Sequence, residues 1–169
     1  MNGSRARAGR HLLACWLLAC VLAAAVAGPA PAALAGVHAI GLISIPRIDL
    51  SKDFFNGQSS ADTALRPSHY PWTAMPGHGR TIAIAGHRVT HTHPFRSLGE
   101  LHRGNLIVLH YGPRFAQKAC YRVARLLKVR PDNVAITDDV GFERLVLTTC
   151  TPPHFATYRL VVFAPRSSC

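Results

Sequence analysis

The feature that most constrains the fold of this chain is a series of short apolar runs, separated by turn residues, that begins after residue 36. Several runs are rich in β-branched residues and end at Gly or Pro, which is typical of β-strands. Two stretches, at 59–71 and 95–104, have the character of short helical turns. The strand-like runs lie at 38–50, 80–88, 105–112, 119–129, 132–138, 144–150 and 158–164. Seven or eight short strands with few helices predict an all-β barrel or sandwich.

Residues 1–36 have a different character and predict an export segment. Arg5, Arg7 and Arg10 form a basic start, and no charged residue occurs from 12 to 27. Small residues at 25, 27, 33 and 35 suit cleavage of a signal peptide, whereas the apolar run approaches the ~20 residues of a membrane-anchoring hydrophobic helix. Both alternatives leave the basic end in the cytoplasm and deliver the rest outside the membrane. We therefore expect a signal peptide or signal-anchor with a short linker at 1–36, and one folded domain at 37–169.

The formal net charge of +11 raises the question of a nucleic-acid partner. The Lys and Arg residues are scattered, and no stretch interleaves them with aromatic residues as a stacking surface would. A basic surface equally suits a protein that works near anionic lipids or cell-wall polymers. The charge therefore favours a membrane or cell-wall setting and no nucleic-acid partner.

The five cysteines divide into two groups. Cys15 and Cys20 belong to the apolar N-terminal segment, which leaves Cys120, Cys150 and Cys169 in the exported domain. Three is an odd number, so at least one thiol stays unpaired even in an oxidising compartment. Cys120 and Cys169 are a possible pair, but sequence alone leaves open whether their geometry permits a bond. If they pair, Cys150 is the free thiol.

Cys150, His87 and Arg159 are the candidate catalytic residues. A thiol attacks as a thiolate, so a catalytic cysteine needs a base or a cation beside it. His87 and Cys150 each stand where an apolar run ends, and Gly86 gives the backbone freedom to turn before His87. If the runs around the Pro-rich loop at 152–153 pair as antiparallel neighbours, Arg159 lies on the same rim as Cys150. A guanidinium there could lower the thiol pKa and bind a developing oxyanion.

Each of these residues also has a purely structural interpretation. A cysteine after a strand is often a small buried hydrophobic residue, and a histidine at a strand end is usually a hydrogen-bonded rim residue. An arginine at a strand start can be a solvated charge. The export segment, the odd cysteine count and the matching strand-end positions together favour catalysis.

Two segments resemble the signature regions of sortases, the cysteine transpeptidases of Gram-positive cell surfaces. They read IAGHRVTHTHPFRSLGELHRGNLIVLHYG and LVLTTCTPPHFATYRLVVFA. The lead-in HYPWTAMPGHGRTIAIAGHR is similar to that of the small actinobacterial groups called class E or F. The resemblance covers about residues 42–165 and implies the closed eight-stranded sortase β-barrel with short helical turns.

The resemblance also implies an activity and a set of site residues. Cys150 matches the nucleophile, His87 the catalytic histidine and Arg159 the arginine that completes the site, while Thr149 lies where the family often places a substrate-contacting hydroxyl. The substrate would be an LPxTG-type or LAxTG-type sorting signal, cleaved between Thr and Gly through a thioacyl-enzyme. The acceptor would be an amine on a peptidoglycan precursor or a pilin. No cofactor or metal is implied, and a thiolate–imidazolium pair and a minor reverse-protonated population are both compatible with the sequence.

Three alternatives stay open. A zinc hydrolase could use His87, His91 and His93 with Cys150, but Pro94 and its β-branched neighbours disfavour the helix that the histidine spacing would need. Another exported cysteine hydrolase could carry the same pair of residues on a different fold. A degenerate, non-catalytic surface barrel is the third.

Overall fold

The computed structural model describes residues 38–169, apart from 58 and 65. The predicted N-terminal hydrophobic helix lies outside these residues, and so does the predicted leader at 1–36. Among the described helices, none has the length and apolar character needed to cross a membrane. The helical elements in this part are α1 (Ser60–Thr63) and the 3₁₀ turns η1 (Pro46–Ile48), η2 (Leu98–Glu100), η3 (Pro113–Phe115) and η4 (Val134–Thr137).

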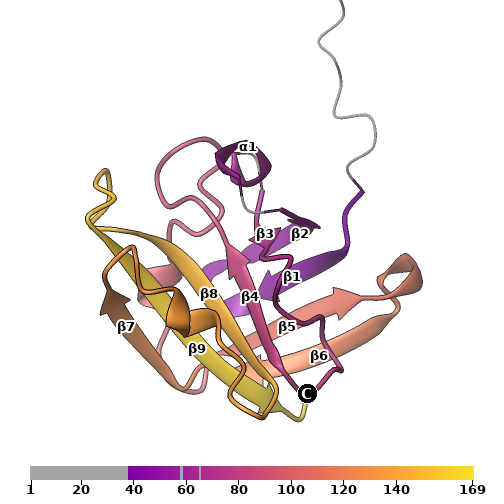
Figure 1. Ribbon diagram of the computed structural model, residues 1–169. Helices are drawn as coiled ribbons and strands as arrows, with labels where there is room; N and C mark the ends of the chain where they lie inside the picture. Colours follow the sequence, from indigo (N-terminus) through magenta and orange to yellow (C-terminus); the bar gives the residue numbers. More distant parts are fainter. Residues whose placement is uncertain (1–37, 58, 65) are drawn as a thin grey trace, which may run out of the picture. The chain divides into compact units, whose positions relative to one another are not determined.

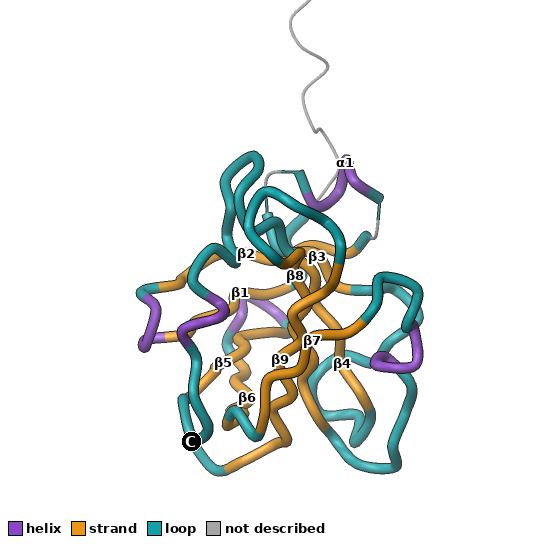
Figure 2. The backbone as a smooth tube through the Cα atoms, turned by 90° about the vertical axis from the view of Figure 1, so that its left-hand side faces the viewer, coloured by secondary structure: helices purple, strands orange, loops and turns teal. Residues whose placement is uncertain are grey.

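Nine strands in the described residues form one closed sheet (Figures 1 and 2). Their order is β6-β5-β1-β2-β3-β4-β8-β9-β7, and β9 also pairs with β6, which closes the barrel. The pairs β2–β3 and β4–β8 are parallel and the others are antiparallel. The strands are β1 (Gly41–Ile45), β2 (Leu50–Asn56), β3 (Ser68–His69), β4 (Thr81–Ala85), β5 (Leu106–Tyr111), β6 (Gln117–Arg122), β7 (Arg125–Val129), β8 (Arg144–Thr151) and β9 (Tyr158–Ser167).

The ninth strand does not change the predicted count of eight, because β6 and β7 are two halves of one strand. Tyr121 pairs with Arg166 and Arg125 pairs with Phe163, so both halves follow the same edge of β9. Between these pairs the chain advances four residues on one strand and three on the other, which is the pattern of a β-bulge. The prediction of a closed eight-stranded barrel is confirmed.

One predicted strand, at 132–138, is wrong. This segment contains the 3₁₀ turn η4, whose carbonyl groups bond side chains of the barrel instead of a neighbouring strand. Thr81 donates its hydroxyl to the Asp138 carbonyl at 2.8 Å, and Arg144 donates to the Ile136 carbonyl at 3.2 Å. Val134 remains largely exposed. The apolar residues at 134–136 therefore did not indicate a strand, and carbonyl groups of this segment accept from side chains instead.

The predicted strand at 38–50 is in fact a hairpin. Pro46 lacks the N–H that a central strand needs, so the chain turns through η1 and returns as β2. The helical turn predicted at 95–104 is confirmed as η2, and the one at 59–71 as α1. At α1, the Ser59 hydroxyl accepts from the Asp62 N–H at 3.1 Å while the Asp62 carboxylate accepts from the Ser59 N–H at 3.0 Å, a reciprocal capping box.

Strands β4, β8 and β9 lie side by side (Figure 1). Their central residues are buried on both faces of the sheet. Their inward residues join the main core, and Ala83, Val146 and Val161 form a second cluster on the outer face. Burial on both faces explains why these strands have nearly continuous apolar sequences. The main core contains, among others, Ile43, Ile45, Phe54, Ile82, Ile84, Phe95, Leu98, Ile107, Leu109, Leu145, Leu147 and Val162.

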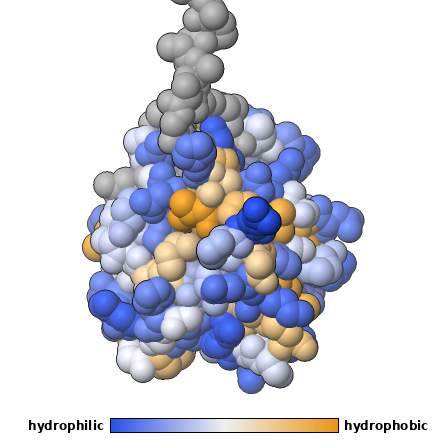
Figure 3. Space-filling view, turned by 90° about the vertical axis from the view of Figure 1, so that its right-hand side faces the viewer, coloured by the Kyte–Doolittle hydropathy of each residue, from blue (hydrophilic) through white to orange (hydrophobic). Residues whose placement is uncertain are grey.

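The face on the right-hand side of Figure 1 is mostly hydrophilic, with a group of hydrophobic residues near its centre (Figure 3). Basic side chains are distributed over several strands, including Lys118 on β6, Lys128 on β7 and Arg144 on β8. This distribution agrees with the scattered basic residues of the sequence.

A half-buried carboxylate organises the end of the barrel where β8 begins. Glu143 accepts a hydrogen bond from the Tyr121 hydroxyl at 2.7 Å, from the N–H groups of Gly77 and Gly79 at 3.0 and 3.2 Å, and from Arg166 at 3.0 Å. Burial alone would raise the pKa of Glu143, but these donors and the Arg166 charge outweigh it and hold the pKa below its usual range. Glu143 thus joins the loop before β4 to β6 and β9.

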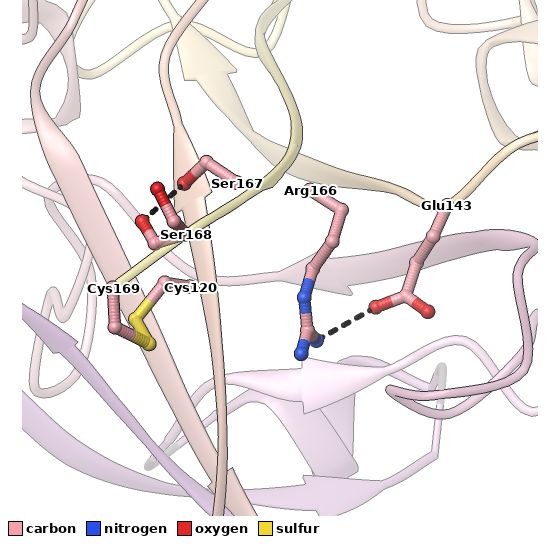
Figure 4. The surroundings of a disulfide bond; sticks show 6 residues. All are labelled: Cys120, Glu143, Arg166, Ser167, Ser168 and Cys169. Carbon is pink, nitrogen blue, oxygen red and sulfur yellow. Dashed lines mark hydrogen bonds and ion pairs between the residues drawn. A yellow bond between two sulfur atoms is a disulfide. The ribbon is translucent and has the colours of Figure 1, made fainter.

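Cys120 and Cys169 form a disulfide close to this ion pair (Figure 4). The bond ties the C-terminal residue to β6, and it resolves the pairing that the sequence left open. Of the three cysteines in the described part of the chain, Cys150 is the free thiol.

We expect the Cys120→Ala/Cys169→Ala double variant to lose stability but to keep its chemistry at low temperature. The disulfide joins residues 49 positions apart, for which the chain-entropy model gives about 4 kcal/mol. Urea unfolding measures the difference in the free energy of unfolding. The matched control is Cys150→Ala, which removes a thiol but no cross-link and should shift the unfolding midpoint little. Equal midpoints for the wild type and the double variant would show that the disulfide contributes nothing.

Candidate active site

His87 and Cys150 lie level with one another at the ends of two parallel strands. In the β4–β8 pair, Thr81 lies opposite Arg144 and Ala85 lies opposite Thr148, an offset of 63 residues. The same offset, continued two residues beyond β4, brings His87 to the level of Cys150. Side chains alternate along a strand, so both groups are on the outer face of the barrel, above the cluster that contains Ala83.

Arg159 lies directly opposite Cys150 in the antiparallel β8–β9 hairpin. Residues paired in this way present their side chains on the same face, with Cβ atoms typically about 5 Å apart. The guanidinium donates hydrogen bonds to the carbonyl groups of Ala156 and Tyr158 at 3.2 and 3.4 Å. The hairpin inferred from the Pro-rich loop is therefore present, and it brings Arg159 to the same rim as the thiol.

The three predicted residues share one open cavity of about 230 Å³. Its wall also includes the hydroxyl groups of Thr63, Tyr70 and Thr148, and the Tyr70 and Thr148 oxygens are 3.3 Å apart. The cavity thus joins a thiol, an imidazole and a guanidinium with a hydroxyl-rich wall. The complete lining is Thr63, Tyr70, Ala85, Gly86, His87, Thr148, Thr149, Cys150 and Arg159.

Two threonines contact the ring nitrogens of His87. Thr90 Oγ1 is 2.8 Å from Nδ1, and Thr63 Oγ1 is 3.4 Å from Nε2. The Thr63 hydroxyl also donates to the Ser59 carbonyl at 3.0 Å. A hydroxyl can donate to or accept from a ring nitrogen, so the donor and acceptor roles at His87 follow its tautomer. The long Nε2 contact is weak, which leaves this nitrogen free to exchange partners.

Burial lowers the pKa of His87, and the neighbouring His91 lowers it further by charge repulsion. The two rings are tilted by 55° with their centroids 4.9 Å apart. His87 is therefore mostly neutral at neutral pH in the resting protein.

Thr149 lies in the cavity wall with its hydroxyl already engaged. The hydroxyl donates to the Gly86 carbonyl at 2.7 Å, and the side chain is buried. A substrate contact through Thr149 stays a prediction. Because the hydroxyl proton is used in the bond to Gly86, Oγ1 could only accept a hydrogen bond from a substrate.

Gly86 itself is required for packing rather than for backbone freedom. A Cβ atom there would lie 2.7 Å from Cδ2 of the buried Phe95, and Gly86 is not among the glycines with positive φ. The role that the sequence predicted for Gly86 is therefore wrong. The glycine lets Phe95 pack against the chain immediately before His87.

Among the described residues, no three His, Cys, Asp or Glu side chains lie close enough together to share a metal ion. The zinc-hydrolase alternative would need such a set. His91 and His93 instead lie in the loop after β4, where both have positive φ angles.

Sequence reasoning did not identify Thr63, Tyr70 or Thr90 as part of the site. Thr90 had a usable signal, since a hydroxyl three residues after a histidine in a tight turn can reach back to its ring. Thr63 and Tyr70 had none, because only the folded barrel brings these residues to the end of β4.

The sortase-domain family model matches residues 43–167. The chain belongs to the sortase family. Sortase E1 of Streptomyces coelicolor is 32% identical over 149 residues, which is 79% of this chain and 42% of that protein. Sortase D of Bacillus subtilis is 29% identical, over 76% of this chain and 64% of that protein. The sortase described here thus spans about two fifths to two thirds of these relatives.

The crystal structure of Sortase E1 from Streptomyces coelicolor with a tripeptide in its active site has a similar fold. Its TM-score to this sortase is 0.72 at 29% identity, and the match covers 78% of this chain and 89% of that one. Fold and sequence therefore agree on a small sortase that resembles class E.

Proposed function

We propose that this sortase is a cysteine transpeptidase that cleaves a sorting-signal peptide and transfers the cleaved protein to an amine. The observation that carries the proposal is the placement of a free thiol, Cys150, level with His87 and directly opposite Arg159 around one cavity. The family membership supports it, and so does a relative whose active site is described as holding a tripeptide.

Cys150 is the nucleophile and His87 is the proton carrier in this proposal. Because the resting His87 is mostly neutral, the thiol proton moves to the imidazole as the sulfur attacks the Thr carbonyl carbon. The Thr–Gly C–N bond then breaks, His87 gives the proton to the leaving amine, and a thioester remains on Cys150. An incoming amine then attacks the thioester and forms a new amide as the C–S bond breaks, while His87 takes the amine proton and returns it to the released sulfur.

Arg159 stabilises the negative oxygen that develops during both attacks. Its guanidinium carries five N–H donors, and Nη1 makes two contacts with backbone carbonyls, so donors remain for an oxyanion above Cys150. Burial of charge in a partly enclosed site makes such a donor worth far more than in water.

The proposed substrate is an LPxTG-type or LAxTG-type sorting signal on an exported protein. The proposed acceptor is an amine of a peptidoglycan precursor or a pilin. We further propose that residues 1–36 act as a signal peptide or signal-anchor, that 37–169 form the catalytic domain, and that this domain works outside the cell membrane. The basic character of the chain suits anionic lipids and cell-wall polymers.

We expect Arg159→Lys to lower kcat/KM by about 10²- to 10³-fold, although the positive charge is kept. Removal of a single oxyanion donor costs about this much, and lysine lacks the planar fork of arginine. Arg130, an exposed arginine in the turn after β7, provides the control, since Arg130→Lys should leave the kinetics unchanged. Wild-type kinetics for Arg159→Lys would remove Arg159 from the mechanism.

A peptide panel tests the proposed function. The purified domain is incubated with fluorescent LPxTG and LAxTG peptides, with a scrambled peptide as control, in the presence and absence of an amine acceptor. The proposal predicts cleavage between Thr and Gly and an amine-dependent ligation product. Cleavage that never gives the ligation product would identify a hydrolase, and no cleavage of any peptide would favour the non-catalytic alternative.

A further inference from the structure

Two side-chain hydrogen bonds connect the ends of β4 and β8. The Thr149 hydroxyl donates to the Gly86 carbonyl at 2.7 Å, and Arg88 Nη1 donates to the Thr151 hydroxyl at 2.8 Å. Both bonds follow the 63-residue offset of the β4–β8 ladder. The residues just before and just after Cys150 therefore contact the residues just before and just after His87.

The side chains of Thr149 and Thr151 lie on the other side of β8 from the Cys150 thiol. The buried Leu145 and Leu147 are in the barrel core, so Thr149 and Thr151, which share their side of β8, also point inward. Cys150 and His87 point outward into the cavity. The Arg88–Thr151 bond thus fixes the backbone next to the catalytic pair from outside the cavity lining, while the Thr149–Gly86 bond joins two residues of the cavity wall.

The backbone ladder alone ends too early to hold His87. Strand β4 ends at Ala85, and the last backbone bond from this segment to β8 joins the Gly86 N–H to the Thr148 carbonyl at 3.1 Å. Beyond Gly86, the Arg88–Thr151 bond is the cross-link that the described residues provide between the His87 segment and β8. His87 lies between these two connections.

Arg88 occupies its place at an energetic cost. Its Nε is buried and has no hydrogen-bond partner among the described residues. A Cβ atom on Gly99 of η2 would lie only 3.1 Å from Arg88 Nη2, so the guanidinium fits closely against this glycine. A buried, unpaired donor typically costs about 1–3 kcal/mol. An unpaired buried donor of this kind calls for a specific explanation.

We propose that Arg88 and Thr151 are positioning residues that, with the Thr149–Gly86 bond, set the spacing between Cys150 and His87. The proposal rests on the proposed cysteine chemistry of this site. It assigns no contact with substrate to either residue. A displacement of reacting groups by about 1 Å can cost about 10²-fold in rate, so a hydrogen bond beneath the pair can control the chemistry above it.

The test compares Thr151→Val, which keeps the shape but loses the hydroxyl, with Thr151→Ser, which keeps the hydroxyl. We expect Thr151→Val to lower kcat by about 10- to 100-fold with little change in KM, and Thr151→Ser to retain nearly wild-type kcat. Arg88→Lys should behave like Thr151→Val, and the double variant should be no worse than either single one, because one bond is lost in each case. Additive losses or an active Thr151→Val would overturn the proposal.

A second readout does not depend on turnover. His87 is titrated by NMR in the wild type, Thr151→Val and Thr151→Ser. The charged or titratable groups around it are Tyr70, Arg88, His91, Cys150 and Arg159. Loss of the bond should free the His87 segment and raise the His87 pKa toward its ordinary value of about 6.5, with Thr151→Ser unchanged. An unchanged pKa in Thr151→Val would count against the proposal. If the wild type cleaved no peptide, the proposed function would fail, while this titration would still decide whether the bond positions His87.

Discussion

Cys150→Ala is expected to abolish both cleavage of a sorting-signal peptide and its transfer to an amine, a loss of at least about 10⁴-fold. The substitution removes the sulfur on which the thioacyl intermediate forms, and no neighbouring group can replace it. Cys150 is the free thiol of the described residues, because Cys120 and Cys169 are joined in a disulfide. The measurement is the rate of peptide cleavage and ligation under conditions that saturate the wild type.

Cys150→Ser is the matched variant for this prediction. It keeps the size and the hydrogen-bonding capacity of the side chain, but its hydroxyl is a much weaker nucleophile at neutral pH, so it should be nearly as inactive as the alanine variant. Both variants should unfold at the same urea concentration as the wild type, since Cys150 lies at the rim rather than in the core. Substantial turnover by Cys150→Ala would exclude the proposed mechanism.

His87→Ala is expected to lower kcat by about 10²- to 10⁴-fold, the range usual for loss of a general acid–base group. The variant lacks the group that takes the thiol proton and returns it to the leaving amine. His91→Ala is the natural control, because its exposed ring is 4.9 Å from that of His87 yet has no assigned proton transfer. Activity close to wild type in His87→Ala, or an equal loss in His91→Ala, would contradict the assignment.

His91→Ala should also change the pH dependence in a defined direction. Burial and the charge of His91 both disfavour the protonated form of His87 and lower its pKa. Removal of His91 abolishes the repulsion, so the pKa of His87 should rise, and the acidic limb of the kcat/KM profile should move to higher pH. Burial persists in this variant, so the pKa should stay below about 6.5. A shift to lower pH would show that the two imidazoles interact in another way.

Much of the barrel could be predicted because the strands that form its core are marked in the sequence. The run around Ile82 and Ile84 and the run that contains Val146 and Leu147 are apolar on both faces, as strands buried on both sides must be. The segment at 132–138 has a similar composition but forms a 3₁₀ turn, since its carbonyls are taken by side chains of other elements. Composition could not reveal these long-range partners.

The sequence predicts those residues of the site that lie at the ends of strands. Cys150, His87 and Arg159 are each marked by the end or start of an apolar run, and the register of β4, β8 and β9 brings the three together. The contacts of Thr63 with His87 and of Arg88 with Thr151 depend on side chains from distant parts of the chain. If the parallel pairing of β4 with β8 had been assigned from sequence, its 63-residue offset would have placed Arg88 level with Thr151.

The most direct test of the central claim is mass spectrometry of the purified domain after incubation with LPxTG and LAxTG peptides without an acceptor amine. The account predicts an adduct on Cys150 with the mass of the peptide up to its Thr, absent in Cys150→Ala and removed by hydroxylamine, which cleaves thioesters. The adduct should disappear, with formation of an amide product, when an amine is added. Peptide cleavage without any adduct on Cys150, or an adduct on another residue, would contradict the claim.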